Sequence, residues 1–152
     1  MTERAEQESL TIQLLRTREA LMQHFRPMLS ARDVSETQWR VLRSLHERST
    51  LEASELAHVA AVMAPSLTRM LKVLEERGLI ALERHPTDGR RLLISLSPQG
   101  KAFMAEAMPE MEKIYARLSL AIDSTRMAEL QRLLKEVAEL ASPKADADGG
   151  SA

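Results

Sequence analysis

A short segment rich in hydroxyl and basic side chains, residues 64–72, carries the residue types best suited to recognising another molecule. If the segment is helical, its polar side chains fall on one face and its leucines on the other. Guanidinium, ammonium and hydroxyl groups donate hydrogen bonds to phosphate oxygens and base edges, so the pattern is typical of a helix that enters the major groove of DNA. The residues expected to contact DNA here are Ala64, Pro65, Ser66, Thr68, Arg69 and Lys72.

The polar residues of this segment have different expected roles. Arg69 suits bidentate hydrogen bonding to guanine or a phosphate contact, and Lys72 suits a phosphate contact. Ser66 and Thr68 suit shorter contacts with bases or phosphates. The alternative is a solvated helix face, which is the interpretation we prefer for the acidic residues further along, beginning at Glu75.

A second basic group, HPTDGRR at residues 85–91, lies between two short apolar runs. Pro86 and an Asp-Gly pair interrupt these runs, which predicts a hairpin with a charged tip. Arg90 is expected to enter a narrow, electronegative minor groove, with an ion pair to Asp88 directing its guanidinium. Arg91 is expected to contact DNA as well, or to hold the hairpin through phosphate or backbone contacts. An ordinary exposed turn is the alternative, and the preceding helical segment favours DNA.

Basic side chains also occur near the aromatic residue Trp39, in the first two predicted helices. A cationic group beside an aromatic ring suits a phenyl carboxylate, because the guanidinium pairs with the acid while the rings stack. Trp39 could equally belong to the core, and the arginines could equally face solvent or DNA phosphates, Arg40 in particular. The residues predicted to bind such an effector are Arg16, Arg18, His24, Trp39 and Arg43.

Several classes of chemistry lack the residues they need. The chain has no cysteine, which excludes disulfides, thiolate metal sites and thiol redox chemistry. Its histidines are dispersed without an H-x-x-x-H spacing, so we expect neither a metal site nor a cofactor. No nucleophile–base pair, paired carboxylates or phosphate loop appears, so the protein is not expected to be an enzyme.

Charge and hydropathy set further limits. The net charge of −1 counts mildly against nucleic-acid binding, for which a basic domain is the usual footprint. Residues 64–72, however, contain two cations and no acid, so the local placement of charge favours it. Because no apolar stretch approaches the length of a membrane span, the sequence predicts a soluble cytoplasmic protein with no membrane contact.

The elements that would position these groups are mostly helical, because aromatic residues are only 3% of the chain and Leu, Met, Val, Ile and Ala must form the core. A capping box at Ser35–Gln38 opens a helix, and Gly78 ends the one that begins at Ala64. The predicted helices are 10–30, from 36 to about 48, 55–61, 64–77, from 98, and from 124; the predicted strands are 50–52, 79–84 and 91–96. The fold class is therefore mainly α with a small β-hairpin.

One domain is expected over residues 10–141, between a flexible lead at 1–9 and a disordered tail at 142–152. The first and last helices are apolar over much of their length, more than a small central module can cover. We expect them to form a separate helical layer that a second copy of the chain completes.

The order of elements, the segment SELAHVAAVMAPSLTRMLKVLEERGLI and the tip DGRR resemble the MarR family of bacterial transcription regulators. The resemblance implies a homodimeric winged helix-turn-helix protein, usually a repressor, that binds a pseudo-palindromic DNA operator. It places the winged module at about 35–97 and the dimerisation helices at about 10–30 and 98–141. The helix with Ser66 and Arg69 would enter the major groove, and the hairpin, or wing, the minor groove.

Within that family, LLRTREALMQHFRPML and TQWRVLRSL are similar to regulators of homoprotocatechuate (4-hydroxyphenylacetate) degradation operons. The resemblance implies a small aromatic carboxylate effector, bound between the dimerisation helices and the DNA-binding lobe, that loosens the DNA complex. Many relatives carry a serine as the cap of the recognition helix, where this chain has Met63. Base contacts at Ala64 and Pro65 would then be apolar or made by the backbone.

A function of another class stays open from the sequence. The near-neutral net charge would also suit a helical interaction protein whose winged helix binds a protein partner instead of DNA.

Overall fold

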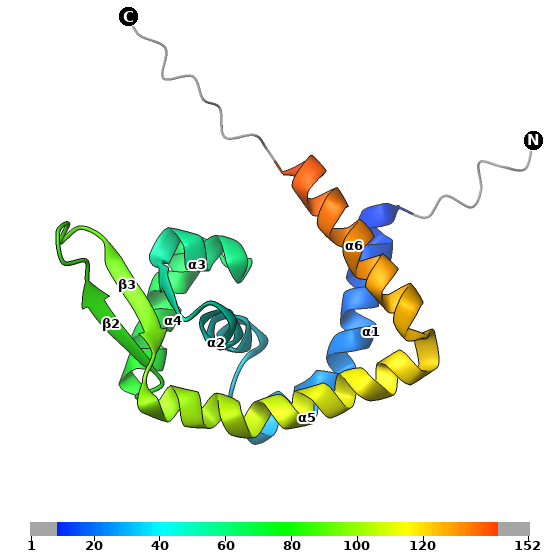
Figure 1. The fold of residues 1–152 in the computed structure, drawn as a ribbon, viewed down its shortest axis with the longest axis horizontal. Coiled ribbons are helices and arrows are strands. Elements are labelled where there is room, and N and C mark those ends of the chain that lie inside the picture. Colours follow the sequence, from blue (N-terminus) through cyan, green and yellow to red (C-terminus); the bar gives the residue numbers. More distant parts are fainter. Residues whose placement is uncertain (1–8, 143–152) are drawn as a thin grey trace, which may run out of the picture. The chain divides into compact units, whose positions relative to one another are not determined.

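The computed structural model describes residues 9–142 and shows a mainly helical chain with one small sheet, which confirms the predicted fold class (Figure 1). The lead and tail predicted at 1–9 and 142–152 lie outside the described residues, except for Ser9 and Ser142. The elements are α1 (Leu10–Ala31), α2 (Glu36–Arg48), β1 (Thr50–Glu52), α3 (Ala53–Val59), α4 (Ala64–Glu76), β2 (Ile80–Arg84), β3 (Leu92–Leu96), α5 (Pro98–Ile122) and α6 (Ser124–Ala141).

The chain divides into two compact units, Met1–Ile114 and Tyr115–Ala152. Unit 1 holds every element from α1 to β3 and the first two-thirds of α5, and unit 2 holds the end of α5 and α6. All side chains predicted to contact DNA or an effector belong to unit 1. Within residues 9–142, no helix combines the length and the apolar character that a membrane span requires.

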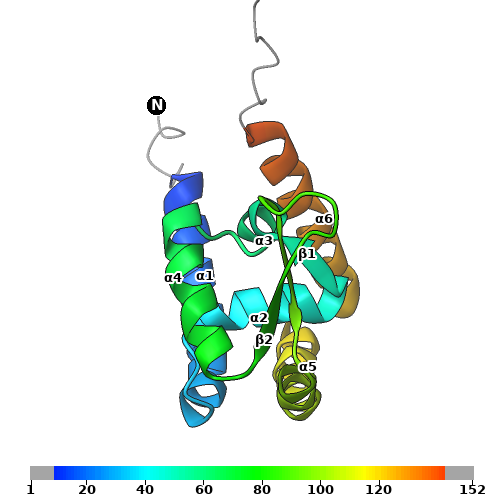
Figure 2. The same cartoon turned by 90° about the vertical axis from the view of Figure 1, so that its left-hand side faces the viewer.

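The sheet of unit 1 is antiparallel, with the strand order β1-β3-β2. Thr50 pairs with Ser95, and Ile80 pairs with Leu96, so the central strand β3 is bonded on both sides. The brief third strand predicted at residues 50–52 is thus confirmed. Because β1 pairs with the middle of β3, it anchors the wing to the body of unit 1. Helix α4 packs beside β2 (Figure 2).

Local signals in the sequence account for most helix ends. Ser35 accepts a hydrogen bond from the Gln38 backbone N–H at 3.1 Å, and the Gln38 side chain accepts one from the Ser35 N–H at 3.0 Å, which confirms the capping box. Gly78 follows α4 with φ of +73°, a conformation that favours glycine. The small helix predicted at 55–61 instead spans Ala53–Val59, because the chain leaves β1 directly into the helix and Ala61 turns it at φ of +52°.

The core of unit 1 lies between the helices and the inner face of the sheet. The buried leucines of α4 belong to this core, and so does Trp39 of α2, which is only 7% exposed. Burying one such side chain stabilises the fold by about 1.5–3 kcal/mol. The polar face of α4 is therefore held on a rigid apolar base. The largest fully buried side chains are Leu42, Leu45, Leu56, Leu74, Ile94, Met104 and Val41.

The two terminal helices leave apolar side chains uncovered. In α1, Leu10 is 57% and Leu15 59% exposed, and none of the residues of α6 is buried. Apolar surface of this extent is typical of a protein–protein interface. The exposed large apolar residues of α6 are Leu130, Leu133, Leu134, Val137 and Leu140.

Candidate nucleic-acid interface

The exposed face of α4 carries the side chains predicted to contact DNA. Leu67, Leu71 and Leu74 are buried, so the helix can present only its opposite face to a ligand. Ser66 is half-buried, and the hydroxyl of Thr68 donates to the carbonyl of Ala64 at 3.1 Å. The other predicted contacts on this helix, all exposed, are Ala64, Pro65, Arg69 and Lys72.

Arg69 and Lys72 are free to bind an anion. Within residues 9–142, neither side chain makes a hydrogen bond or an ion pair. The acids of α4, Glu75 and Glu76, are confined to its last turn, and no acid precedes them on this helix. Both side chains can thus meet phosphate oxygens or base edges without first breaking an internal contact.

The loop of the wing is ordered by Asp88. Its carboxylate accepts a hydrogen bond from the backbone N–H of Arg90 at 3.1 Å, and its carbonyl accepts one from the N–H of Arg91 at 3.0 Å. The described side chains of Asp88 and Arg90 form no ion pair, which differs from the expected contact between carboxylate and guanidinium. A short carboxylate reaches the backbone N–H two residues on more easily than a long, solvated side chain, and so it stabilises the turn.

Two of the wing's arginines are occupied by contacts inside the protein. Arg84, at the end of β2, donates to the carbonyl of Gly89 at 2.7 Å and so closes the loop. Arg91 forms an ion pair with Glu52 of β1, and the hydrogen bond to that carboxylate raises the pKa of the guanidinium above its ordinary value. The exposed side chain of Arg90 has no such partner among residues 9–142. The geometry therefore presents Arg90 at the tip of a wing that its neighbours hold.

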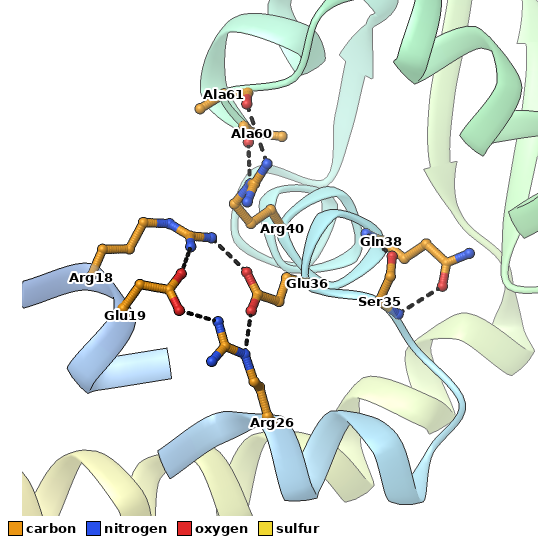
Figure 3. Close-up of polar contacts among 9 residues, drawn as sticks. All are labelled: Arg18, Glu19, Arg26, Ser35, Glu36, Gln38, Arg40, Ala60 and Ala61. Carbon is orange, nitrogen blue, oxygen red and sulfur yellow. Dashed lines mark hydrogen bonds and ion pairs between the residues drawn. The ribbon is translucent and has the colours of Figure 1, made fainter. Parts of the chain in front are cut away.

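Arginines also hold both ends of α4. On the N-terminal side, Nε of Arg40 in α2 donates to the carbonyl of Ala60 at 2.9 Å, in the turn that leads to α4 (Figure 3). On the C-terminal side, Arg77 donates to the carbonyl of Asp33 at 2.6 Å. The pKa of the Arg40 guanidinium is lowered below its ordinary value. Burial is the main cause, and the nearby positive charge of Arg18 adds to it. Arg40 thus binds backbone carbonyls in this structure, whereas the sequence left open whether it contacts DNA or a ligand.

The start of α2, the turn before α4 and α4 itself line an open hollow of about 520 Å³ on the surface. Its lining includes Ser66 and Arg69 from α4, and Gln38 and Arg40 from α2. A hollow lined by hydroxyl, amide and guanidinium groups fits a phosphate backbone that passes beside the helix. The remaining lining residues are Ser35, Thr37, Ala61, Val62, Met63, Met70 and Val73.

The residues predicted to bind an effector are partly brought together. Trp39 and Arg43 stand one turn apart on α2; Trp39 is buried and Arg43 is half-buried, paired with Glu47 at 2.7 Å. Arg18 reaches from α1 to Glu36 at the start of α2. Arg16 and His24 lie on exposed parts of α1.

A four-residue charge cluster connects α1 with the start of α2 (Figure 3). Glu36 binds Arg18 at 2.7 Å and Arg26 at 2.8 Å, and Glu19 completes the cluster with Arg26 at 2.8 Å. The hydrogen bond from Arg18 is the largest cause that lowers the pKa of the Glu36 carboxyl, and Arg26 adds to it. A carboxylate ligand of Arg18 would therefore compete with Glu36. No functional role was predicted for Glu36 or Arg26 from the sequence.

No metal-binding cluster occurs in the part of the chain that the structure describes, since no three His, Cys, Asp or Glu side chains are suitably grouped there. The recognisable features of the site are its hydroxyl and basic groups on α4, the wing and the start of α2. These groups suit binding to a polyanion.

Comparison with known proteins identifies similar chains. The profile of the MarR family matches residues 34–92. The chain is 35% identical to the Homoprotocatechuate degradative operon repressor of Escherichia coli over 90% of its own length and 93% of that protein. It is also 35% identical to the HTH-type transcriptional regulator FarR of Neisseria gonorrhoeae, over 87% and 90% of the two chains. The crystal structure of NadR in complex with 4-hydroxyphenylacetate matches with a TM-score of 0.83 at 34% identity, covering 92% of this chain and 99% of that one.

Proposed function

Because the chain belongs to the MarR family and is a DNA-binding transcriptional regulator, we propose that it is a homodimeric repressor of an operon for aromatic-acid catabolism. The operator would be a pseudo-palindrome, with α4 of each protomer in a major groove and each wing in the adjoining minor groove. A small aromatic carboxylate would release the repressor. The relatives named above are regulators, which supports a role other than catalysis.

One observation carries the DNA-binding part of the proposal. Arg69, Lys72 and Arg90 have no internal partner among residues 9–142, whereas Arg84 and Arg91 of the same wing are held by contacts within the protein. Unpaired cations on an ordered scaffold suit phosphate contacts and groove insertion, because binding does not have to break existing ion pairs. The local charge therefore outweighs the net charge of −1.

The uncovered apolar faces of α1 and α6 support the dimer. Leu140 of α6 is 80% exposed and Leu10 of α1 is 57% exposed, and a second copy of the chain would bury such faces. In a symmetric dimer the two copies of α4 would contact half-sites about 34 Å apart, one turn of DNA. A pseudo-palindromic operator follows from that symmetry.

The effector part of the proposal combines two observations. Arg43 lies one turn from Trp39 on α2, with Arg18 near the start of the same helix, which suits a ring bearing a carboxylate. One similar protein is named as the homoprotocatechuate operon repressor, and another was crystallised with 4-hydroxyphenylacetate. We infer an effector of this hydroxyphenyl-carboxylate class. A ligand carboxylate that takes Arg18 from Glu36 would loosen α2 from α1.

The test is an electrophoretic mobility shift with the purified protein and the DNA upstream of its own gene. We expect retardation at nanomolar protein in moderate salt, weaker retardation of a scrambled fragment, and release by 4-hydroxyphenylacetate. Release by phenol alone, with no carboxylate, would contradict the proposed ligand chemistry. Failure to retard any DNA would favour the other function that the near-neutral net charge allows, binding of a protein partner by the winged helix.

A further inference from the structure

The start of α4 exposes apolar residues where a DNA-binding surface would ordinarily be polar. Met63 is 77% exposed, more than any other large apolar residue of unit 1 that the structure describes. Ala64 and Pro65, which follow it, are exposed as well. Single exposed apolar side chains are common on protein surfaces. Here, however, three of them are consecutive, and they occupy the end of the helix that is proposed to enter the major groove.

The backbone of Met63 takes part in the hydrogen bonding of α4, whereas its side chain does not. Its carbonyl accepts the first hydrogen bond of α4, from the N–H of Leu67 at 2.9 Å. Its side chain caps nothing, since a thioether does not replace a hydroxyl as an acceptor for the free N–H groups of the helix. It instead lines the same open hollow as Ser66 and Arg69. Met63 thus faces the side where the polar contacts to DNA are proposed.

The chemistry of the major groove identifies what an apolar side chain can recognise there. Each base edge offers hydrogen-bonding groups, and only thymine also offers a methyl group. A methionine against a guanine or cytosine edge would leave polar groups without partners, whereas against a thymine methyl both surfaces leave water favourably. The flexible, polarisable thioether adapts to such a small apolar target.

We propose that Met63, with Ala64 and Pro65 beside it, reads the 5-methyl groups of thymines in the operator. This inference rests on the proposed DNA-binding function and adds a base preference to it. Arg69, one or two turns further along the helix, supplies the polar contacts, and Met63 selects for thymine near the end of each half-site. Methyl contact is worth about fourfold in affinity per group, or about fifteenfold for a dimer that makes one contact in each half-site.

The test uses the DNA upstream of the gene in two forms, amplified either with thymidine triphosphate or with deoxyuridine triphosphate in its place. Uracil pairs as thymine does and lacks only the methyl group. Dissociation constants are measured for both forms with the wild-type protein and with Met63→Ser. Serine is a good helix cap, so the variant should unfold at the same temperature as the wild type or higher, which excludes misfolding as the cause of a loss.

We expect the wild-type protein to bind the thymine form about fifteenfold more tightly than the uracil form, and this ratio to be at least about threefold smaller for the variant. If Met63→Ser changes the ratio of the two dissociation constants by less than about threefold, the inference is overturned. Any effect of uracil on DNA shape is the same for both proteins and cannot account for a difference between them. If the wild-type protein retards neither form, the proposed DNA-binding function itself fails, and the inference fails with it.

Discussion

Nε of Arg40, on α2, donates a hydrogen bond to the carbonyl of Ala60 at 2.9 Å, immediately before the turn into α4. The same guanidinium approaches the carbonyl of Ala61 at 3.4 Å, the residue whose φ of +52° reverses the chain. A residue other than glycine in that conformation is uncommon and needs support from its surroundings. Arg40 therefore fixes the angle at which α4 leaves the turn.

Replacing Arg40 by methionine keeps much of the apolar stem and removes the donors. We expect the free energy of unfolding to fall by about 1–2 kcal/mol, because the partly buried carbonyl of Ala60 and the exposed carbonyl of Ala61 lose a charged donor. Affinity for DNA should fall further than the stability loss explains, since α4 becomes misaligned. Urea unfolding and mobility shifts on the same preparation measure the two effects. Native stability and native DNA affinity in Arg40→Met would contradict this role.

The charge cluster of α1 and α2 gives a pH dependence with a definite sign. Arg18 and Arg26 hold the pKa of Glu36 below its ordinary value of 4.5. A lowered folded-state pKa means that the unfolded chain binds the proton more tightly. Glu36 thus stabilises the fold above about pH 4.5, and the contribution is lost as the pH falls towards the folded-state pKa.

The measurement is the unfolding free energy of wild-type protein and Glu36→Gln between about pH 3 and 6. The wild type should be the more stable protein at the upper end of this range, and the difference should shrink as the pH falls. Salt should also reduce it, because the cluster is partly exposed to solvent. A difference that stays constant with pH would show that the carboxylate charge is not the stabilising feature.

Arg43 offers the sharpest test of the effector assignment. Its replacement by glutamine keeps hydrogen-bonding capacity and removes the charge that would pair with a carboxylate. We expect calorimetry to show at least about tenfold weaker binding of 4-hydroxyphenylacetate, the range of a lost charge-assisted pair. DNA affinity without ligand should be unchanged. Lys113→Ala, which removes an exposed charge on a different helix, α5, is the control and should bind ligand normally. Wild-type ligand affinity in Arg43→Gln would refute the assignment.

The sequence allowed the fold to be predicted because the signals that set it are local. The hydroxyl and amide of the Ser35–Gln38 capping box stand three residues apart, and Gly78 supplies positive φ where α4 ends. Apolar periodicity placed the leucines of α4 on the buried side. The small helix was misplaced by two residues because its ends depend on β1 and on Ala61 rather than on a cap of its own.

The roles of individual arginines were harder to predict, for a physical reason. Arg40, Arg77 and Arg84 all bind backbone carbonyls, and a carbonyl belongs to every residue, so no side-chain pattern marks the partner. The partners of Arg40 and Arg77 are also 20 and 44 residues distant. The pairing of Arg91 with Glu52 depends on the register of β1 against β3, which residue types alone do not reveal.

The most direct test of the central claim is the salt dependence of DNA binding. Dissociation constants for the DNA upstream of the gene are measured between about 50 and 200 mM salt for wild-type protein, Arg90→Ala and Lys113→Ala. Lys113 is the matched control, because it is also an exposed cation without an internal partner among residues 9–142.

If Arg90 of each wing occupies a minor groove, Arg90→Ala should bind more weakly and its logarithmic salt slope should be shallower by about two for the dimer. Lys113→Ala should keep the wild-type slope. Binding by Arg90→Ala with the same affinity and slope as the wild type would contradict the account of the wing as a DNA-binding element.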